Sequence, residues 1–222
     1  MIKLFIKLFG VFSIISLPTI YAQSFEIQDG SKQYNAFINT TCEQELCDAK
    51  AEIELFKKGQ KTVFQKFHSD ELTMYLDNNS KPSANVVQIY GEQSPLIFGD
   101  FNFDGTEDVA IRNGNDGAYG GPVYDIYVFN KTKHKFVFSK ELSSLTQENL
   151  GMFTIDEARK RIITFNKSGC CYHTTSEYIV VPKKDLLLVE ETIQEATENK
   201  VTVTSRQLIH GKWREKVKYF NQ

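Results

Sequence analysis

The sequence predicts an all-β protein. Three observations favour this class: helical periodicity of apolar residues is almost absent, short β-prone runs alternate with turn residues, and one strand–turn–strand pattern recurs along the chain. The length of 222 residues is enough for one domain with a sizeable core.

The predicted strands are short and follow one another at spacings of roughly ten residues, which is typical of a sandwich or a propeller. They are Ala51–Phe56, Thr62–Phe67, Leu72–Leu76, Val86–Tyr90, Leu96–Phe98, Val109–Ile111, Tyr124–Phe129, Phe136–Phe138, Ile162–Phe165, Tyr178–Val181, Leu186–Val189, Val201–Val203 and Trp213–Tyr219.

A weak internal repeat favours the propeller. The segment Ile53–Lys66 resembles Ile126–Lys140, and Tyr178–Val189 and Val201–Tyr219 repeat its order of strand, Lys/Gly turn and strand. Such a hairpin at multiples of roughly 35–40 residues is what the blades of an antiparallel sheet produce. We therefore expect a small, irregular β-propeller of about five blades over residues 23–222. The alternative is that the hairpins are alike only because all-β proteins share such hairpins.

Residues 1–22 are predicted to be a cleavable signal peptide. Lys3 and Lys7 give a positive start, Leu8–Leu17 is nearly all apolar, and Ala22 is a small residue at the expected cleavage site. A membrane anchor is the alternative, but the apolar run is short for a bilayer and no second span follows. The expected location is the periplasm, with no membrane span after signal removal.

The charge of the chain argues against nucleic acid as a partner. The net charge is −2, and removing Lys3 and Lys7 with the signal peptide makes the expected mature chain mildly acidic. No basic run remains that would follow a phosphate backbone. Mild acidity suits a basic protein partner, although only weakly.

The cysteines form two close pairs, Cys42 with Cys47 and Cys170 with Cys171. An even number of cysteines in an oxidising compartment indicates disulfides, and four cysteines allow three connectivities. Local pairing is the simplest interpretation, since Cys42 and Cys47 flank a short polar turn. Crossed pairing between the two sites is the alternative.

The strongest motif is Asp100–Asp108, which predicts a bound calcium ion. Oxygen-bearing side chains recur at alternate positions, and Gly105 permits a sharp turn between them. Hard oxygen donors crowded this closely suit Ca²⁺ better than Mg²⁺ or a softer metal. The predicted ligands are Asp100, Asn102, Asp104, the backbone carbonyl of Thr106, and Asp108. The alternative is an Asp/Asn/Gly turn without a metal.

We expect this calcium to be structural, because the loop supplies nearly a full protein shell whereas a catalytic ion needs open positions. Without a cation, three carboxylates in one turn repel one another, so the metal should hold this region together. The four histidines are scattered, and neither Gly-x-Ser-x-Gly nor His-Glu-x-x-His occurs. The chain is therefore not expected to be an enzyme.

Two further loops stand out. The glycine-rich segment 113–122 is predicted to be a surface loop that exposes Tyr119. The segment 167–174 interrupts a predicted hairpin, and a turn fixed by Cys170 and Cys171 would display Tyr172 and His173 to a protein partner. The alternative for the second loop is a disulfide that serves stability only.

The calcium loop together with Gly120–Phe129 and Lys167–His173 resembles small periplasmic β-propeller proteins of bacteria, which carry an Asp-rich loop of the integrin and VCBS type. Some members of that family are immunity proteins that inhibit lysozyme-like effectors of secretion systems by placing a loop in the enzyme's cleft. The resemblance implies a periplasmic, calcium-stabilised inhibitor of a peptidoglycan hydrolase, with Tyr172 in the plugging loop. A second hypothesis is an envelope binding module for a glycan or a protein, without catalysis.

Overall fold

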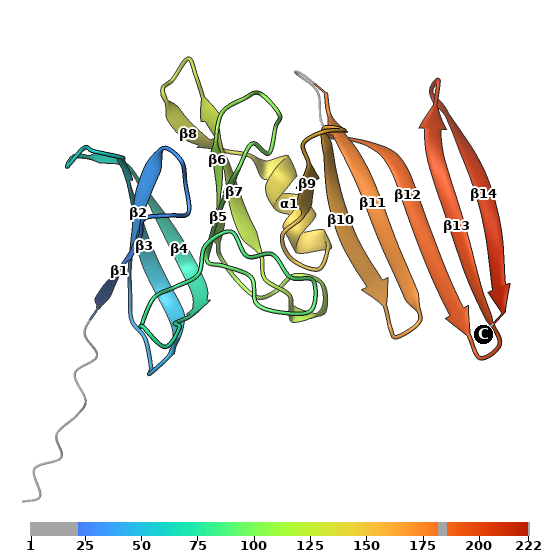
Figure 1. Cartoon of the computed structure of the whole chain (residues 1–222), viewed down its shortest axis with the longest axis horizontal. Helices are drawn as coiled ribbons and strands as arrows, with labels where there is room; N and C mark the ends of the chain where they lie inside the picture. The colour runs from blue at the N-terminus through green and yellow to red at the C-terminus, as the bar shows by residue number, and fades with distance from the viewer. Residues whose placement is uncertain (1–21, 182–185, 222) are drawn as a thin grey trace, which may run out of the picture.

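The computed structural model describes residues 22–181 and 186–221, so the expected signal peptide lies outside the described residues except for Ala22. The described chain forms three antiparallel sheets, which confirms the all-β prediction. The sheets contain four, four and six strands and follow one another in a row (Figure 1). The described residues form no closed ring of blades, so the five-bladed propeller is not confirmed.

The first sheet has the order β1-β2-β3-β4. Its strands are β1 (Gln23–Ile27), β2 (Tyr34–Thr40), β3 (Leu46–Lys57) and β4 (Val63–Tyr75). Burial alternates along β2, where Tyr34, Ala36 and Ile38 point into the core. The separate strands expected at Thr62–Phe67 and Leu72–Leu76 are one strand, because polar residues such as Ser69 interrupt the apolar pattern without ending the pairing.

The second sheet is the middle layer and contributes residues to a core on each of its faces. It consists of β5 (Leu96–Gly99), β6 (Asp108–Arg112), β7 (Tyr124–Asn130) and β8 (Lys135–Phe138). Val109 and Ile111 of β6 belong to the core shared with the first sheet. Ala110, on the opposite face of the same strand, belongs to the core shared with the helix and the third sheet.

A helix that the sequence analysis did not predict joins the second and third sheets. α1 (Lys140–Glu148) begins at Ser139, whose hydroxyl accepts a hydrogen bond from the Leu142 N–H at 3.4 Å. Leu142 and Leu145 are buried beside Ile126 of β7. None of the described helices is long and apolar enough to cross a membrane.

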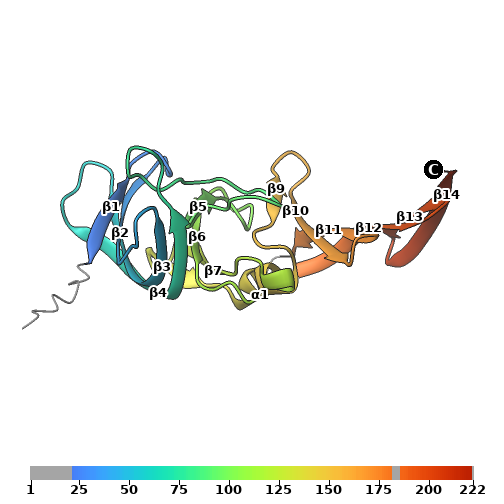
Figure 2. The ribbon, with the colours of Figure 1, turned by 90° about the horizontal axis from the view of Figure 1, so that it is seen from below.

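The third sheet has the order β14-β13-β12-β11-β10-β9. Its strands are β9 (Thr154–Asp156), β10 (Arg161–Ser168), β11 (Tyr172–Val180), β12 (Leu186–Thr197), β13 (Lys200–Ile209) and β14 (Lys212–Asn221). The start of this sheet packs on the core around α1 through Ile162, whereas β12 to β14 extend away from the body of the molecule (Figure 2).

The strand predicted at Val86–Tyr90 is a loop. Asn85 has a positive φ of 59°, and the hydroxyl of Ser94 accepts a hydrogen bond from the Val86 N–H at 3.0 Å. Side chains thus satisfy backbone groups that a ladder would otherwise pair. The loop carries Tyr90 to the surface beside the third sheet, where it contacts Phe165.

Candidate functional site

The predicted calcium loop connects β5 and β6, as the strand-like flanks of the motif led us to expect. Two residues within it have a positive φ, Phe103 at 57° and Gly105 at 82°. Glycine adopts this conformation without steric penalty, so Gly105 permits the sharp reversal. The turn brings side chains at alternate positions onto one side of the loop.

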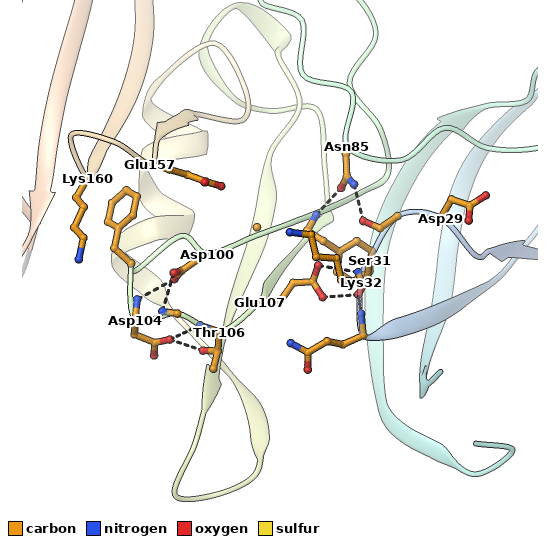
Figure 3. A pocket seen from close by; sticks show the side chains of 16 residues that line it. Asp29, Ser31, Lys32, Asn85, Asp100, Asp104, Thr106, Glu107, Glu157 and Lys160 are labelled. Carbon is orange, nitrogen blue, oxygen red and sulfur yellow. Dashed lines mark hydrogen bonds between the residues drawn. The ribbon is translucent and has the colours of Figure 1, made fainter. Parts of the chain in front are cut away.

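The oxygens of the loop converge on its own backbone (Figure 3). Asp100 Oδ1 and Asn102 Oδ1 both accept from the Asp104 N–H, at 2.9 and 3.0 Å. Asp100 Oδ2 accepts from the Gly105 N–H at 2.8 Å, and Asp104 Oδ1 accepts from the Thr106 N–H at 2.9 Å. Asp104 Oδ1 also accepts from the Thr106 hydroxyl, whereas the Asp100 and Asn102 oxygens each accept one of these bonds and retain a lone pair that can coordinate a cation.

Asp108 lies at the base of the loop and is fully buried. One of its oxygens accepts from the Phe101 N–H at 2.9 Å and the other from the Phe129 N–H at 2.8 Å. The pKa of Asp108 is raised to about 7, chiefly by burial and also by the negative charges of Asp100 and Asp104, while the two hydrogen bonds act in the opposite direction. A cation at the loop would offset the charge that makes ionised Asp108 unfavourable.

The donors present fit calcium by their chemistry. The candidate ligands are the side-chain oxygens of Asp100, Asn102, Asp104 and Asp108 and the carbonyl of Thr106, all hard oxygen donors. The described residues hold no group of three or more His, Cys, Asp or Glu side chains placed as a metal site. Two of the five candidate donors, the amide of Asn102 and the backbone carbonyl of Thr106, are not among these four side-chain types. The carboxylates of Asp100 and Asp104 accept hydrogen bonds from backbone N–H groups of the loop.

A cavity of about 850 Å³ lies beside the loop. One side is formed by the loop itself, and another by the turn that precedes β2, which carries Ser31 (Figure 3). Glu107 spans the two sides, because its carboxylate accepts from the Ser31 hydroxyl at 2.5 Å and from the Lys32 N–H at 3.2 Å. Glu107 was not identified from the sequence, because its role depends on a contact 76 positions away in sequence.

Both cysteine pairs are local, so the prediction of Cys42–Cys47 and Cys170–Cys171 disulfides is confirmed and the crossed alternative is excluded. The second bridge lies in the turn between β10 and β11, and Gly169 before it has a φ of 65°. Residues 168–171 are all exposed. The structure therefore has a disulfide-bonded tip at the end of this hairpin.

The two residues predicted to face a partner do not lie together. Tyr172 and His173 are consecutive in β11, so their side chains lie on opposite faces of the sheet. Tyr172 pairs in register with Ser168, whereas His173 pairs with Lys167. A partner that contacts both side chains would therefore have to reach around the tip.

His173 belongs to a group of side chains that we call the tip cluster. Its members are Tyr90, Tyr119, Phe165, Lys167 and His173. The His173 ring stacks on Phe165 with the centroids 5.9 Å apart, and Phe165 meets Tyr90 edge to face at 6.2 Å. The Lys167 Nζ lies 5.0 Å from the Tyr90 ring and 4.8 Å from the Tyr119 ring.

The tip cluster holds the tip in position. The Tyr119 hydroxyl accepts a hydrogen bond from the Gly169 N–H at 2.5 Å, next to the Cys170–Cys171 bridge. Tyr119 is 62% exposed and Tyr90 is 67% exposed, so the cluster also presents aromatic surface to solvent. The exposed Tyr119 was expected from its glycine-rich loop, but Tyr90 and Phe165 were not identified from the sequence.

The fold and these sites define an antiparallel all-β protein with an Asp-rich loop and a disulfide-bonded hairpin tip. No protein-family model matches the chain, and no curated protein matches it. A solved structure described as "Structure of a Xanthomonas Type IV Secretion System related protein" is similar, with a TM-score of 0.62 and 23% sequence identity. The similarity covers 86% of this chain and 92% of that one, and it is a likeness of fold.

Proposed function

We propose that the mature chain is a periplasmic, calcium-stabilised protein that binds and inhibits a lysozyme-like peptidoglycan hydrolase, as the immunity partner of a secreted effector. The observation that carries this proposal is the tip of the β10–β11 hairpin, which is exposed and cross-linked by Cys170–Cys171. The secretion-related description of the structural neighbour is compatible with it. The resemblance to calcium-loop propeller proteins, in which a loop plugs the cleft, supplies the mode of binding.

The tip suits a cleft because little of its freedom remains to be lost on binding. The disulfide, the Gly169–Tyr119 hydrogen bond and the position of Lys167 between two rings all restrict it in the free protein. Preorganised loops bind more tightly, because ordering a free side chain costs roughly 0.5–1.5 kcal/mol. In this arrangement Tyr172, which directly follows the Cys170–Cys171 bridge in sequence, enters the cleft.

Inhibition should depend on Tyr172. The mature protein is expected to suppress the clearing of a peptidoglycan suspension by its target hydrolase, and Tyr172→Ala is expected to weaken inhibition by about 30-fold or more. This is the loss typical of a central aromatic residue at an interface. The inhibition constant is measured by titrating the protein into the turbidity assay against a panel of lysozyme-like hydrolases.

A matched control is Phe138→Ala, which truncates an aromatic residue that is 48% exposed on the middle sheet. It should leave the inhibition constant unchanged. The double variant Cys170→Ser/Cys171→Ser should weaken inhibition less than Tyr172→Ala, because it removes preorganisation and keeps the ring. If excess protein leaves every hydrolase in the panel active, or if Phe138→Ala is as harmful as Tyr172→Ala, the inhibitor proposal is wrong.

A groove on the face of the third sheet that carries His173, opposite to the face of Tyr172, favours a second candidate function, an envelope module that binds glycan. The groove has a volume of about 360 Å³. Its lining residues are Tyr90, Phe165, His173, Thr175, Thr192 and Gln194. Flat rings beside hydroxyl and amide groups suit a sugar chain, whose apolar ring faces pack on aromatic residues while its hydroxyls form hydrogen bonds.

The two candidate functions can be distinguished because they use residues on opposite faces of the third sheet. If the groove binds glycan, Tyr90→Ala should strongly reduce retention of the protein on insoluble peptidoglycan without any hydrolase present. Tyr172→Ala should leave retention intact, since Tyr172 lies on the other face from His173. A pull-down with purified peptidoglycan measures both variants, and equal retention of wild type and Tyr90→Ala would exclude the groove as the glycan site.

A further inference from the structure

In the part of the chain that the structure describes, one edge of β14, the last strand of the third sheet, has no partner strand. Among the described residues, β14 pairs with β13 alone, and all ten of its residues are exposed. It belongs to the part of the sheet that extends away from the core around α1 (Figure 2). A free edge presents a row of unpaired N–H and C=O groups on which another strand can form.

The hairpin geometry identifies which backbone groups face outward. His210 and Gly211 form the two-residue turn with φ values of 50° and 74°, and Ile209 and Lys212 are the pair that closes it. The closing pair exchanges its hydrogen bonds within the hairpin, and bonded and non-bonded pairs alternate along an antiparallel ladder. The outward-facing groups are therefore those of Trp213, Glu215, Val217 and Tyr219.

The two faces of β14 differ in chemistry, because alternate side chains point to opposite sides. One face carries Trp213, Val217 and Tyr219, which are 46%, 38% and 63% exposed, together with Glu215, which lies opposite Arg206 of β13. The other face carries four basic residues, Lys212, Arg214, Lys216 and Lys218, followed by Phe220 at the end of the strand. The residues of β13 on this second face, from Val201 to Ile209 at alternate positions, include no acidic side chain. The four positive charges are therefore not neutralised across the ladder, in a chain whose net charge is −2.

We propose that β14 binds an extended segment of a partner protein whose side chains alternate between acidic and apolar, and that this segment adds to the third sheet as a further strand. Its acidic side chains would lie beside the basic face of β14, and its apolar side chains beside Trp213 and Val217. Main-chain hydrogen bonds supply affinity in this mode and the alternating side chains supply specificity. A second copy of β14 is disfavoured, since it would place basic residues beside basic residues.

This surface is independent of the proposed hydrolase site. β14 lies three strands from β11, which is about 14 Å at the usual spacing between strands. Strand addition at β14 and inhibition at the tip can therefore be tested separately, and the failure of one does not imply the failure of the other.

The experiment uses the fluorescence of Trp213, which is the only tryptophan of the chain. The mature protein is titrated at low salt with a ten-residue peptide of alternating Glu and Val. Parallel titrations use a peptide of alternating Lys and Val, and one with the same residues as the first but with its acids grouped. The Glu/Val peptide should shift the Trp213 emission, and the other two should bind more weakly.

Three variants test the mode of binding. Lys212→Glu/Lys216→Glu should weaken binding of the Glu/Val peptide by roughly tenfold or more, since the reversal replaces attractive charge pairs with repulsive ones. Val217→Pro removes one outward N–H at a position where an edge strand tolerates proline, and it should abolish binding. Lys58→Glu/Lys61→Glu, which reverses two charges at the β3–β4 turn, should change nothing.

Hydrogen exchange of the wild-type protein provides a second measurement that needs no variant. The amides of Trp213, Glu215, Val217 and Tyr219 should gain protection when the Glu/Val peptide is bound. The proposal is overturned if that peptide does not bind, if the Lys/Val peptide binds as well, or if these four amides stay unprotected at saturation. Binding to vesicles of anionic lipid without binding to the peptide would also overturn it in favour of a membrane surface.

Discussion

Calcium should raise the melting temperature of the mature protein by about 5–10 °C when it is present at roughly 100 times its dissociation constant. Binding to the native state alone at that ratio stabilises by about 2.7 kcal/mol. For a chain of this length each kcal/mol shifts the melting temperature by about 2–4 °C. The measurement is a thermal melt in EDTA followed by a melt with added Ca²⁺.

Asp104→Ala should abolish this rise, because it removes the third of the five predicted ligands. Asp77→Ala is the matched control, since Asp77 also accepts two backbone hydrogen bonds within a turn, from Asn79 at 2.8 Å and Lys81 at 2.9 Å. Its turn has only two oxygen-bearing side chains at alternate positions, Asp77 and Asn79, and the third such position is Lys81, so the calcium effect should persist in this variant. A melting temperature that does not respond to Ca²⁺ in the wild type would show that Asp100–Asp108 is a turn without a metal.

The loop was predictable because its information is local. Nine consecutive residues contain the oxygen donors and the glycine that turns the chain, and the adjacent apolar runs identify the strands on either side. The two disulfides were predictable for the same reason, since each joins cysteines at most five positions apart. What the motif does not contain is the environment of Asp108, which depends on Phe129 in another strand.

The rest of the candidate site is non-local. The tip cluster brings together Tyr90, Tyr119 and Phe165 from three separate segments, and only the β10–β11 register places His173 among them. The loop at Tyr90 has the composition of a strand but is held by side-chain hydrogen bonds, as Ser94 shows. Composition alone therefore could not distinguish that loop from a strand, or predict that its aromatic residue meets the third sheet.

The arrangement of the sheets also could not be predicted from the pattern of repeating hairpins. Hairpins that repeat at regular intervals are compatible with a ring of blades and with sheets that follow one another in a row. What separates the two is which faces are covered, and β6 is buried on both faces while β14 is exposed throughout. The sequence does contain a helix signal for α1, namely the N-cap residue Ser139 and the apolar residues Leu142 and Leu145 three positions apart. The helix has only nine residues, so this periodicity is too brief to stand out among the many predicted strands.

Asp108→Ala should destabilise the protein even in EDTA, by roughly 2–6 kcal/mol. The substitution leaves the Phe101 and Phe129 N–H groups buried without their acceptor, and each such loss costs about 1–3 kcal/mol. Denaturant unfolding of the wild type and the variant in EDTA measures the difference. Asp104→Ala, whose side chain accepts only bonds within the loop and from neighbouring exposed groups, should cost much less under the same conditions.

Asp108→Asn separates the two roles of this side chain. The amide oxygen can still accept one backbone hydrogen bond, and the variant carries no charge at a position where burial already disfavours the ionised carboxyl. In EDTA it should therefore be more stable than Asp108→Ala, whereas with calcium it should gain less than the wild type because a negative ligand is missing. If Asp108→Ala were as mild as Asp104→Ala in EDTA, Phe101 and Phe129 would have to find other acceptors, and Asp108 would act through the metal alone.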